Sequence, residues 1–152
     1  MDFLTEHKKA IRSATNSRNR KKGAKAEDVA AEALRAAGYA CVEPIETGWT
    51  IIRKYNPVKK TSVIASAFPK KKVSGDIKAI QPGSGRMVHV EVKSYLGNLA
   101  FSVLADHQVE ALDRVNNYGG IGILAWVQGC ECRLYNWPID GFGPRKSLKW
   151  PG

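Results

Sequence analysis

The stretch SGDIKAIQPGSGRMVHVEVKS, residues 74–94, reads as two β-strands joined by a glycine-rich turn. If the hairpin is symmetric about Gly83 and Ser84, Asp76 on the first strand falls directly opposite Glu91 on the second. Like charges that face each other across a strand pair destabilise it. The hairpin therefore raises the question of why two carboxylates face each other on adjacent strands.

The second strand alternates between valine and other residues, so its two faces differ in character. We expect the valine face to pack in the core, with Ile77 and Ala79 of the first strand beside it. Asp76 then shares the face of Glu91, and Lys93 lies two residues further along. On that face His89 is expected to pack against its neighbours, with a contact to substrate as the alternative. The polar face carries Met87, His89, Glu91 and Lys93, and the core face carries Val88, Val90 and Val92.

Two carboxylates about 5 Å apart repel each other unless a cation lies between them. A hard divalent cation such as Mg²⁺ prefers oxygen ligands and can take one carboxylate from each strand. An ammonium group at Lys93 can orient or help deprotonate a water, or neutralise charge that builds on a phosphate. The pattern therefore predicts a metal site at Asp76 and Glu91, with Mg²⁺ as the cofactor and Mn²⁺ able to substitute.

The rest of the chain predicts an α/β domain in which helices flank a mixed central sheet. Residues 24–39 predict a helix that Gly38 ends, with Glu27 at the edge of its apolar face. Residues 105–120 predict a second helix, with Gln108 on the inward face. Strands are predicted at 39–46, 48–56, 121–128 and 130–137. Residues 56–72 are predicted to form a mobile excursion. The tail at 140–152 is predicted to be loop-like and to end on an exposed Trp150.

The 152-residue chain has a net charge of +10, and its Lys and Arg residues are clustered. Such clusters suit a polyanion, most simply nucleic acid. Residues 1–22 are predicted to form a basic flexible arm before a domain at 23–152, and a second basic cluster lies within 53–72. The predicted DNA-binding residues are Arg18, Arg20, Lys21, Lys22, Lys25, Lys59, Lys60, Lys70, Lys71 and Lys72.

No apolar run is long enough to span a membrane, and the N-terminus has no apolar signal-peptide core. We therefore expect a location in the cytoplasm, or in the host cytoplasm if the protein is viral, with no membrane partner. The three cysteines are expected to be reduced thiols, because their number is odd and no secretion signal is present.

The order of SGD, a hairpin and then EVK resembles the catalytic signature of the PD-(D/E)xK nuclease superfamily. KGAKAEDVAAEAL, residues 22–34, resembles the N-terminal helix whose glutamate joins the metal site, and Glu27 matches that position. HQVEALDRVNNYGGIGILAWV, residues 107–127, resembles the helix and strand that follow the lysine in Holliday junction resolvases of the RecU, archaeal and phage type. The chain departs from the motif at Gly75, where the family has proline before the aspartate.

The resemblance implies a restriction-endonuclease-like core and a Mg²⁺-dependent endodeoxyribonuclease, most simply a homodimeric resolvase of four-way DNA junctions. Asp76, Glu91 and the Val92 carbonyl would bind the metal, and Glu27 would complete the site directly or through water. Lys93 would activate or orient the attacking water. Gln108 is implied as a site residue, although a buried amide that caps a strand explains it equally well.

Two alternatives remain at the level of sequence. One is another nuclease of the same superfamily that acts on flaps, ends or specific sites. The other is a non-catalytic DNA-binding module that keeps a nuclease-like fold, for which the paired charges at Asp76, Glu91 and Lys93 have no use.

Overall fold

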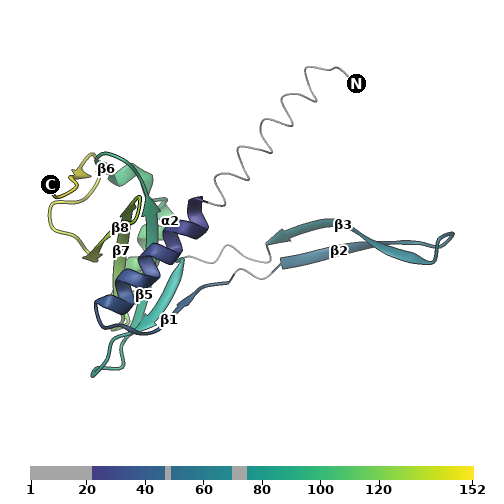
Figure 1. Ribbon diagram of the computed structural model, residues 1–152, viewed down its shortest axis with the longest axis horizontal. Coiled ribbons are helices and arrows are strands. Elements are labelled where there is room, and N and C mark those ends of the chain that lie inside the picture. The colour runs from purple at the N-terminus through teal and green to yellow at the C-terminus, as the bar shows by residue number, and fades with distance from the viewer. Residues whose placement is uncertain (1–21, 47–48, 70–74) are drawn as a thin grey trace, which may run out of the picture.

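A computed structural model describes residues 22–46, 49–69 and 75–152 of the chain. Its centre is a five-stranded sheet with the strand order β1-β4-β5-β7-β8 (Figure 1). β5 and β7 are parallel and the other neighbouring pairs are antiparallel, so the sheet is mixed. The strands of this sheet are β1 (Ala40–Pro44), β4 (Ile77–Ile80), β5 (Met87–Ser94), β7 (Ile121–Gln128) and β8 (Glu131–Asn136).

A helix covers each face of the sheet (Figure 1). The helix of residues 22–36 buries Ala26, Ala30 and Leu34 against one face, where the three valines of β5 also pack. On the other face, α2 (Asp106–Asn117) buries Leu112 against β7. The predicted α/β class, a mixed sheet flanked by helices, is confirmed.

The β4–β5 hairpin has the predicted symmetric register, from Ile77 opposite Val90 to Ile80 opposite Met87. Asp76 immediately precedes β4 and donates its backbone N–H to the Val90 carbonyl at 2.9 Å. The hydrogen bonds between these two strands therefore place Asp76 at the end of β5 that carries Glu91. β7 lies along the other side of β5 and is buried through six consecutive residues, as its apolar sequence predicts.

β2 (Trp49–Asn56) and β3 (Thr61–Pro69) form a separate two-stranded ribbon that projects from the sheet (Figure 1). The predicted excursion at 56–72 therefore contains a strand at residues 61–69, which the sequence did not predict. The Asn56 side chain accepts backbone N–H groups of Val58 and Lys59 at 3.0 and 3.2 Å, which fixes the turn. The lysines and proline of the turn favoured the prediction of an excursion, although the residues that follow include β-branched residues, which favour a strand.

The C-terminal segment packs against the α2 side of the sheet through β9 (Ser147–Leu148), which pairs with β6 (Leu99–Ala100). A short 3-10 helix, η1 (Phe101–Val103), follows β6. The Trp150 ring meets the buried Trp126 edge to face at 4.9 Å, and the Arg133 guanidinium lies 5.7 Å from its centroid. The predicted exposed Trp150 is therefore wrong: the half-buried indole covers the aromatic core on that face.

Cys41, Cys130 and Cys132 are free thiols. Among the described residues, no helix combines the length and the apolar character needed to cross a membrane.

Candidate active site

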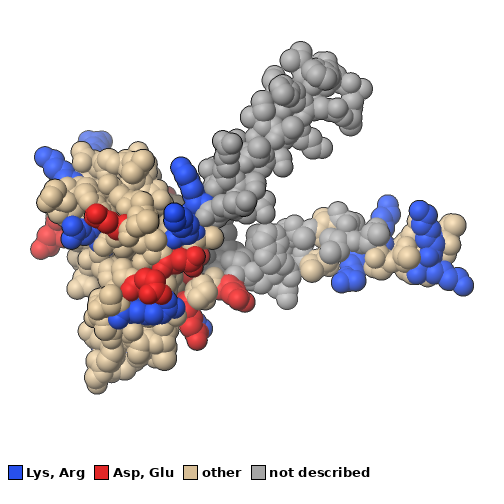
Figure 2. Space-filling model, in the orientation of Figure 1, with Lys and Arg blue, Asp and Glu red and all other residues tan. Residues whose placement is uncertain are grey.

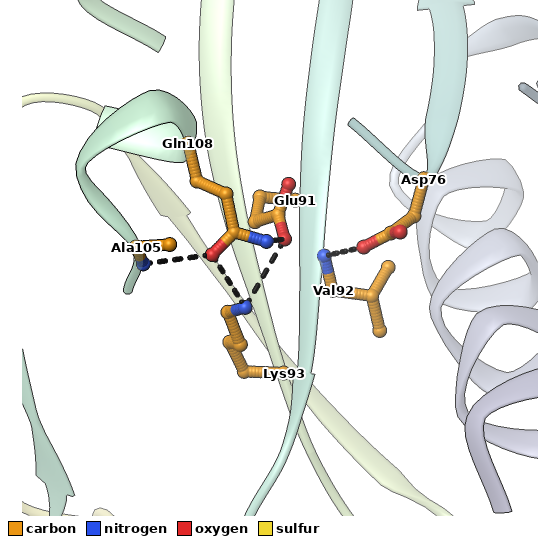
Figure 3. Close-up of polar contacts among 6 residues, drawn as sticks. All are labelled: Asp76, Glu91, Val92, Lys93, Ala105 and Gln108. Atoms are coloured by element: carbon orange, nitrogen blue, oxygen red, sulfur yellow. Dashed lines mark hydrogen bonds and ion pairs between the residues drawn. The ribbon is translucent and has the colours of Figure 1, made fainter. Parts of the chain in front are cut away.

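Most of the residues predicted to carry chemistry lie together at the carboxyl end of β5, as Figure 3 shows for Asp76, Glu91, Lys93 and Gln108. The Asp76 Oδ2 atom accepts the backbone N–H of Val92 at 2.7 Å. Glu91 is only 2% exposed, and it is the one charged residue buried to this degree among those described. The sequence predicted the Val92 carbonyl as a metal ligand, and the structure brings Val92 into the site through its N–H.

Glu91, Lys93 and Gln108 form a closed polar network (Figure 3). The Lys93 ammonium lies 3.2 Å from Glu91 Oε1 and 2.8 Å from Gln108 Oε1. The Gln108 amide nitrogen donates to the same Glu91 oxygen. The structure therefore places Gln108 directly against Glu91 and Lys93, the two charged residues of the EVK motif.

The orientation of the Gln108 amide is fixed by the start of α2. Its oxygen accepts the backbone N–H of Ala105 at 2.9 Å, which is the side-chain half of a capping box. Because Ala105 and Lys93 both donate to that oxygen, the amide nitrogen is left to face Glu91. The Gln108 side chain thus caps the start of α2 and also holds the Glu91 carboxylate.

Three carboxyl groups interact electrostatically at this end of the sheet. Burial, reinforced by Asp76, raises the pKa of Glu91 to about 7, although Lys93 and the Gly75 N–H oppose the shift. Burial also raises the pKa of Asp76, against the opposing effects of the Val92 N–H, Lys93 and His89. The pKa of the half-buried Glu27 is raised by burial and then by Asp76, which places Glu27 within electrostatic reach. The repulsion predicted from the hairpin is therefore present.

This repulsion gives a testable dependence of stability on pH. The folded protein holds the Glu91 proton up to about pH 7, whereas the ordinary pKa of a glutamate is 4.5. The contribution of protonated Glu91 to the free energy of unfolding is therefore fully present below pH 4.5 and is lost as the pH rises through 7. In EDTA, Glu91→Gln should gain on the order of 2–3 kcal/mol of unfolding free energy over wild type between pH 5 and pH 8. Urea unfolding at both pH values measures it.

Glu131→Gln, at an exposed position of β8, is the matched control and should follow the wild-type pH profile. If Glu91→Gln and wild type lose stability in parallel from pH 5 to pH 8, the Glu91 carboxyl is ionised throughout and the electrostatic description of the site is wrong.

The donor set of the site fits a hard cation. Asp76 and Glu91 offer carboxylate oxygens, the ligands that Mg²⁺ prefers, and a cation would relieve the repulsion by Asp76 that helps to raise the pKa of Glu91. Residues 22–46, 49–69 and 75–152 contain no group of three or more His, Cys, Asp or Glu side chains arranged to hold a metal ion. The place of Glu27 in a metal site stays a prediction.

The predicted DNA-binding residues fall into two described groups. Lys22 and Lys25 are exposed on the helix of residues 22–36, and this helix already includes Lys22, which the sequence assigned to the flexible arm. Lys59 and Lys60 are exposed at the turn of the β2–β3 ribbon. The other predicted contacts lie outside the described residues: Arg18, Arg20, Lys21, Lys70, Lys71 and Lys72.

Sequence reasoning missed the backbone contributions to this site. The Gly75 N–H hydrogen-bonds to Glu91, and the Ala105 N–H holds the Gln108 amide. The only signal for the first was a glycine just before the motif aspartate, and the second carried no signal, because alanine is a poor N-cap residue.

No protein-family model matches this sequence, and no curated protein matches it either.

Proposed function

We propose that this protein is a Mg²⁺-dependent endodeoxyribonuclease that hydrolyses phosphodiesters in branched DNA, most simply at four-way junctions. The observation that carries the proposal is the buried Glu91 carboxylate, bonded to Lys93 and Gln108 and repelled by Asp76 at the end of one hairpin. A purely structural network has no need for a second carboxylate, Asp76, that raises the pKa of the buried Glu91. The order of these residues along the chain also resembles the PD-(D/E)xK signature.

Each side chain has a distinct part in the proposed hydrolysis. Asp76 and Glu91 would hold the metal, which when bound supplies Lewis-acid stabilisation of the phosphate oxygens. The Lys93 ammonium would orient the attacking water and offset the charge that develops on the phosphate. Gln108 would keep Glu91 and Lys93 in register, since it bonds to both.

The β2–β3 ribbon is the proposed contact to DNA away from the cut. Over residues 49–69 it carries Arg53, Lys54, Lys59 and Lys60 and no Asp or Glu, and Figure 2 shows basic side chains on the projecting ribbon. A two-stranded ribbon fits the major groove of duplex DNA. An isolated ribbon exposed on both faces is only marginally stable, so a bound duplex would also order it.

The experiment that tests the proposal is a nicking assay on four-way junctions, flaps, free ends and plain duplex, each with and without Mg²⁺. Cleavage of junctions that depends on Mg²⁺ supports the proposal, and paired cuts in opposed strands would require two sites, as a two-fold homodimer supplies. Cleavage confined to flaps or ends would identify another type of nuclease. Binding without cleavage on every substrate would identify a DNA-binding module.

The ribbon lysines should contribute affinity by releasing counterions, with little effect on sequence preference. Lys59→Gln combined with Lys60→Gln is expected to weaken junction binding and to make the slope of log K against log salt shallower by about 2. Fluorescence anisotropy in Ca²⁺ over a salt series measures both effects. Lys146→Gln with Lys149→Gln, at exposed positions near the C-terminus, is the matched control. An unchanged slope in the ribbon variant would place the ribbon off the DNA.

A further inference from the structure

The backbone at Gly75 has no room for a side chain. Its φ angle is +90°, and a Cβ atom built there would lie 2.3 Å from Cε1 and 2.4 Å from Nε2 of His89. Both distances are far below any normal contact between non-bonded atoms. The imidazole of His89 is therefore packed directly against the Gly75 backbone.

His89 is held there by packing. The ring is half-buried on the polar face of β5, where it follows Met87 and precedes Glu91. Its Nε2 atom is buried and has no hydrogen-bond partner in the described structure. Leaving a buried polar atom unpaired costs free energy, so a hydrogen bond of Nε2 to the described residues does not explain why the ring lies here.

The Gly75–Asp76 backbone beneath the ring is connected to both carboxylates of the site. The Gly75 N–H hydrogen-bonds to Glu91, and the Asp76 N–H donates to the Val90 carbonyl at 2.9 Å. The Asp76 carboxylate in turn accepts the Val92 N–H. A shift of this dipeptide would therefore disturb both proposed metal ligands together.

We infer that His89 is a positioning residue, whose ring fills the volume over Gly75 and so fixes the Asp76 carboxylate at the end of β5. The expected effect of His89 on cleavage rests on the proposed function, whereas its effect on the position of Asp76 rests on the packing alone. It also accounts for the departure at Gly75. A proline there would need a φ near −65° in place of +90°, and a Cβ atom on the present backbone would meet the imidazole.

The test compares His89→Ala, which empties the volume, with His89→Phe, which refills it with a ring of similar shape. In the metal-free full chain, NMR hydrogen exchange at the Asp76 and Val92 amides reports the local structure. The Val88 amide, in the same strand, reports global unfolding. His89→Ala should accelerate exchange at Asp76 and Val92 at least tenfold more than at Val88, and His89→Phe should restore most of the protection.

Cleavage gives the second measurement. His89→Ala should lower kcat at least tenfold and raise the Mg²⁺ concentration for half-maximal rate, with KM for the junction unchanged, and His89→Phe should recover both. Met87→Ala removes an exposed side chain from the same face of β5 and should change neither. A structural role without positioning would lower thermal stability and leave the Mg²⁺ dependence as in wild type.

The outcomes separate this inference from the proposed function. If wild type cuts no DNA with Mg²⁺, the proposed function fails, and hydrogen exchange alone decides the packing role. Equal acceleration at Val88 and Asp76 in His89→Ala overturns the inference, as does wild-type protection in that variant. A His89→Phe variant as impaired as His89→Ala also overturns it, because the nitrogen atoms would then matter more than the shape.

Discussion

Asp76→Asn is expected to lower Mg²⁺-dependent cleavage of a four-way junction by at least about a hundredfold, because metal placement and charge stabilisation are lost together. The substitution keeps the size of the side chain, and the amide oxygen of asparagine can still accept the Val92 N–H. Single-turnover cleavage with saturating enzyme measures the loss without a contribution from binding. Asp140→Asn, at an exposed position, is the matched control.

Two further measurements make this prediction specific to the site. Junction binding in Ca²⁺ should survive in Asp76→Asn, since the proposed phosphate contacts lie on the basic residues. In EDTA at neutral pH the variant should be more stable than wild type, because ionised Asp76 is disfavoured by burial and repels Glu91. Near-normal Mg²⁺-dependent cutting by a pure Asp76→Asn preparation would refute the assignment of the active site.

Lys93→Met is expected to lower the same cleavage rate by roughly a thousandfold, near the upper end of the effect of removing one transition-state donor. Methionine keeps most of the length and the apolar stem of lysine and removes only the cation. Junction binding should change little, because Lys93 is mostly buried and bonded to Glu91 and Gln108. Single-turnover rates and anisotropy separate the two effects.

The matched control is Lys78→Met, which removes an exposed ammonium that pairs with Glu43 at 3.2 Å on the neighbouring strand β1. An exposed ion pair contributes little to stability, so this variant should resemble wild type. Lys93→Met should also melt at a lower temperature in EDTA at pH 8, since it leaves Glu91 buried without its cation. A cleavage rate within threefold of wild type would show that Lys93 has no part in the chemistry.

The parts of the fold that the sequence predicted are those fixed by local rules. The β4–β5 register follows from the turn at Gly83 and from strict alternation, because a slip of one residue would turn the valines to the wrong face. The first helix follows from alanine-rich periodicity, and its end follows from Gly38, which has a φ of +91°. That register also determines the positions of Asp76, Glu91 and Lys93.

The parts that the sequence could not predict depend on contacts between distant segments. Trp150 is covered only because β9 pairs with β6 and brings the indole to Trp126. The contact between His89 and Gly75 requires the backbone to turn into a positive φ, which no pattern of residue types records. The contact of Gln108 with Glu91 needs α2 to begin at a particular residue over β5, and helix ends are the least predictable boundaries.

The ribbon leaves the sheet and returns to it at almost the same place. The Ile45 N–H donates to the Asp76 carbonyl at 2.9 Å, and β1 pairs with β4 without any help from β2 or β3. The length and sequence of the ribbon are therefore free to vary while the β1–β4 register stays fixed. Replacing the ribbon with another of different length or sequence should therefore change which DNA shapes the proposed nuclease binds and leave the proposed active site unchanged.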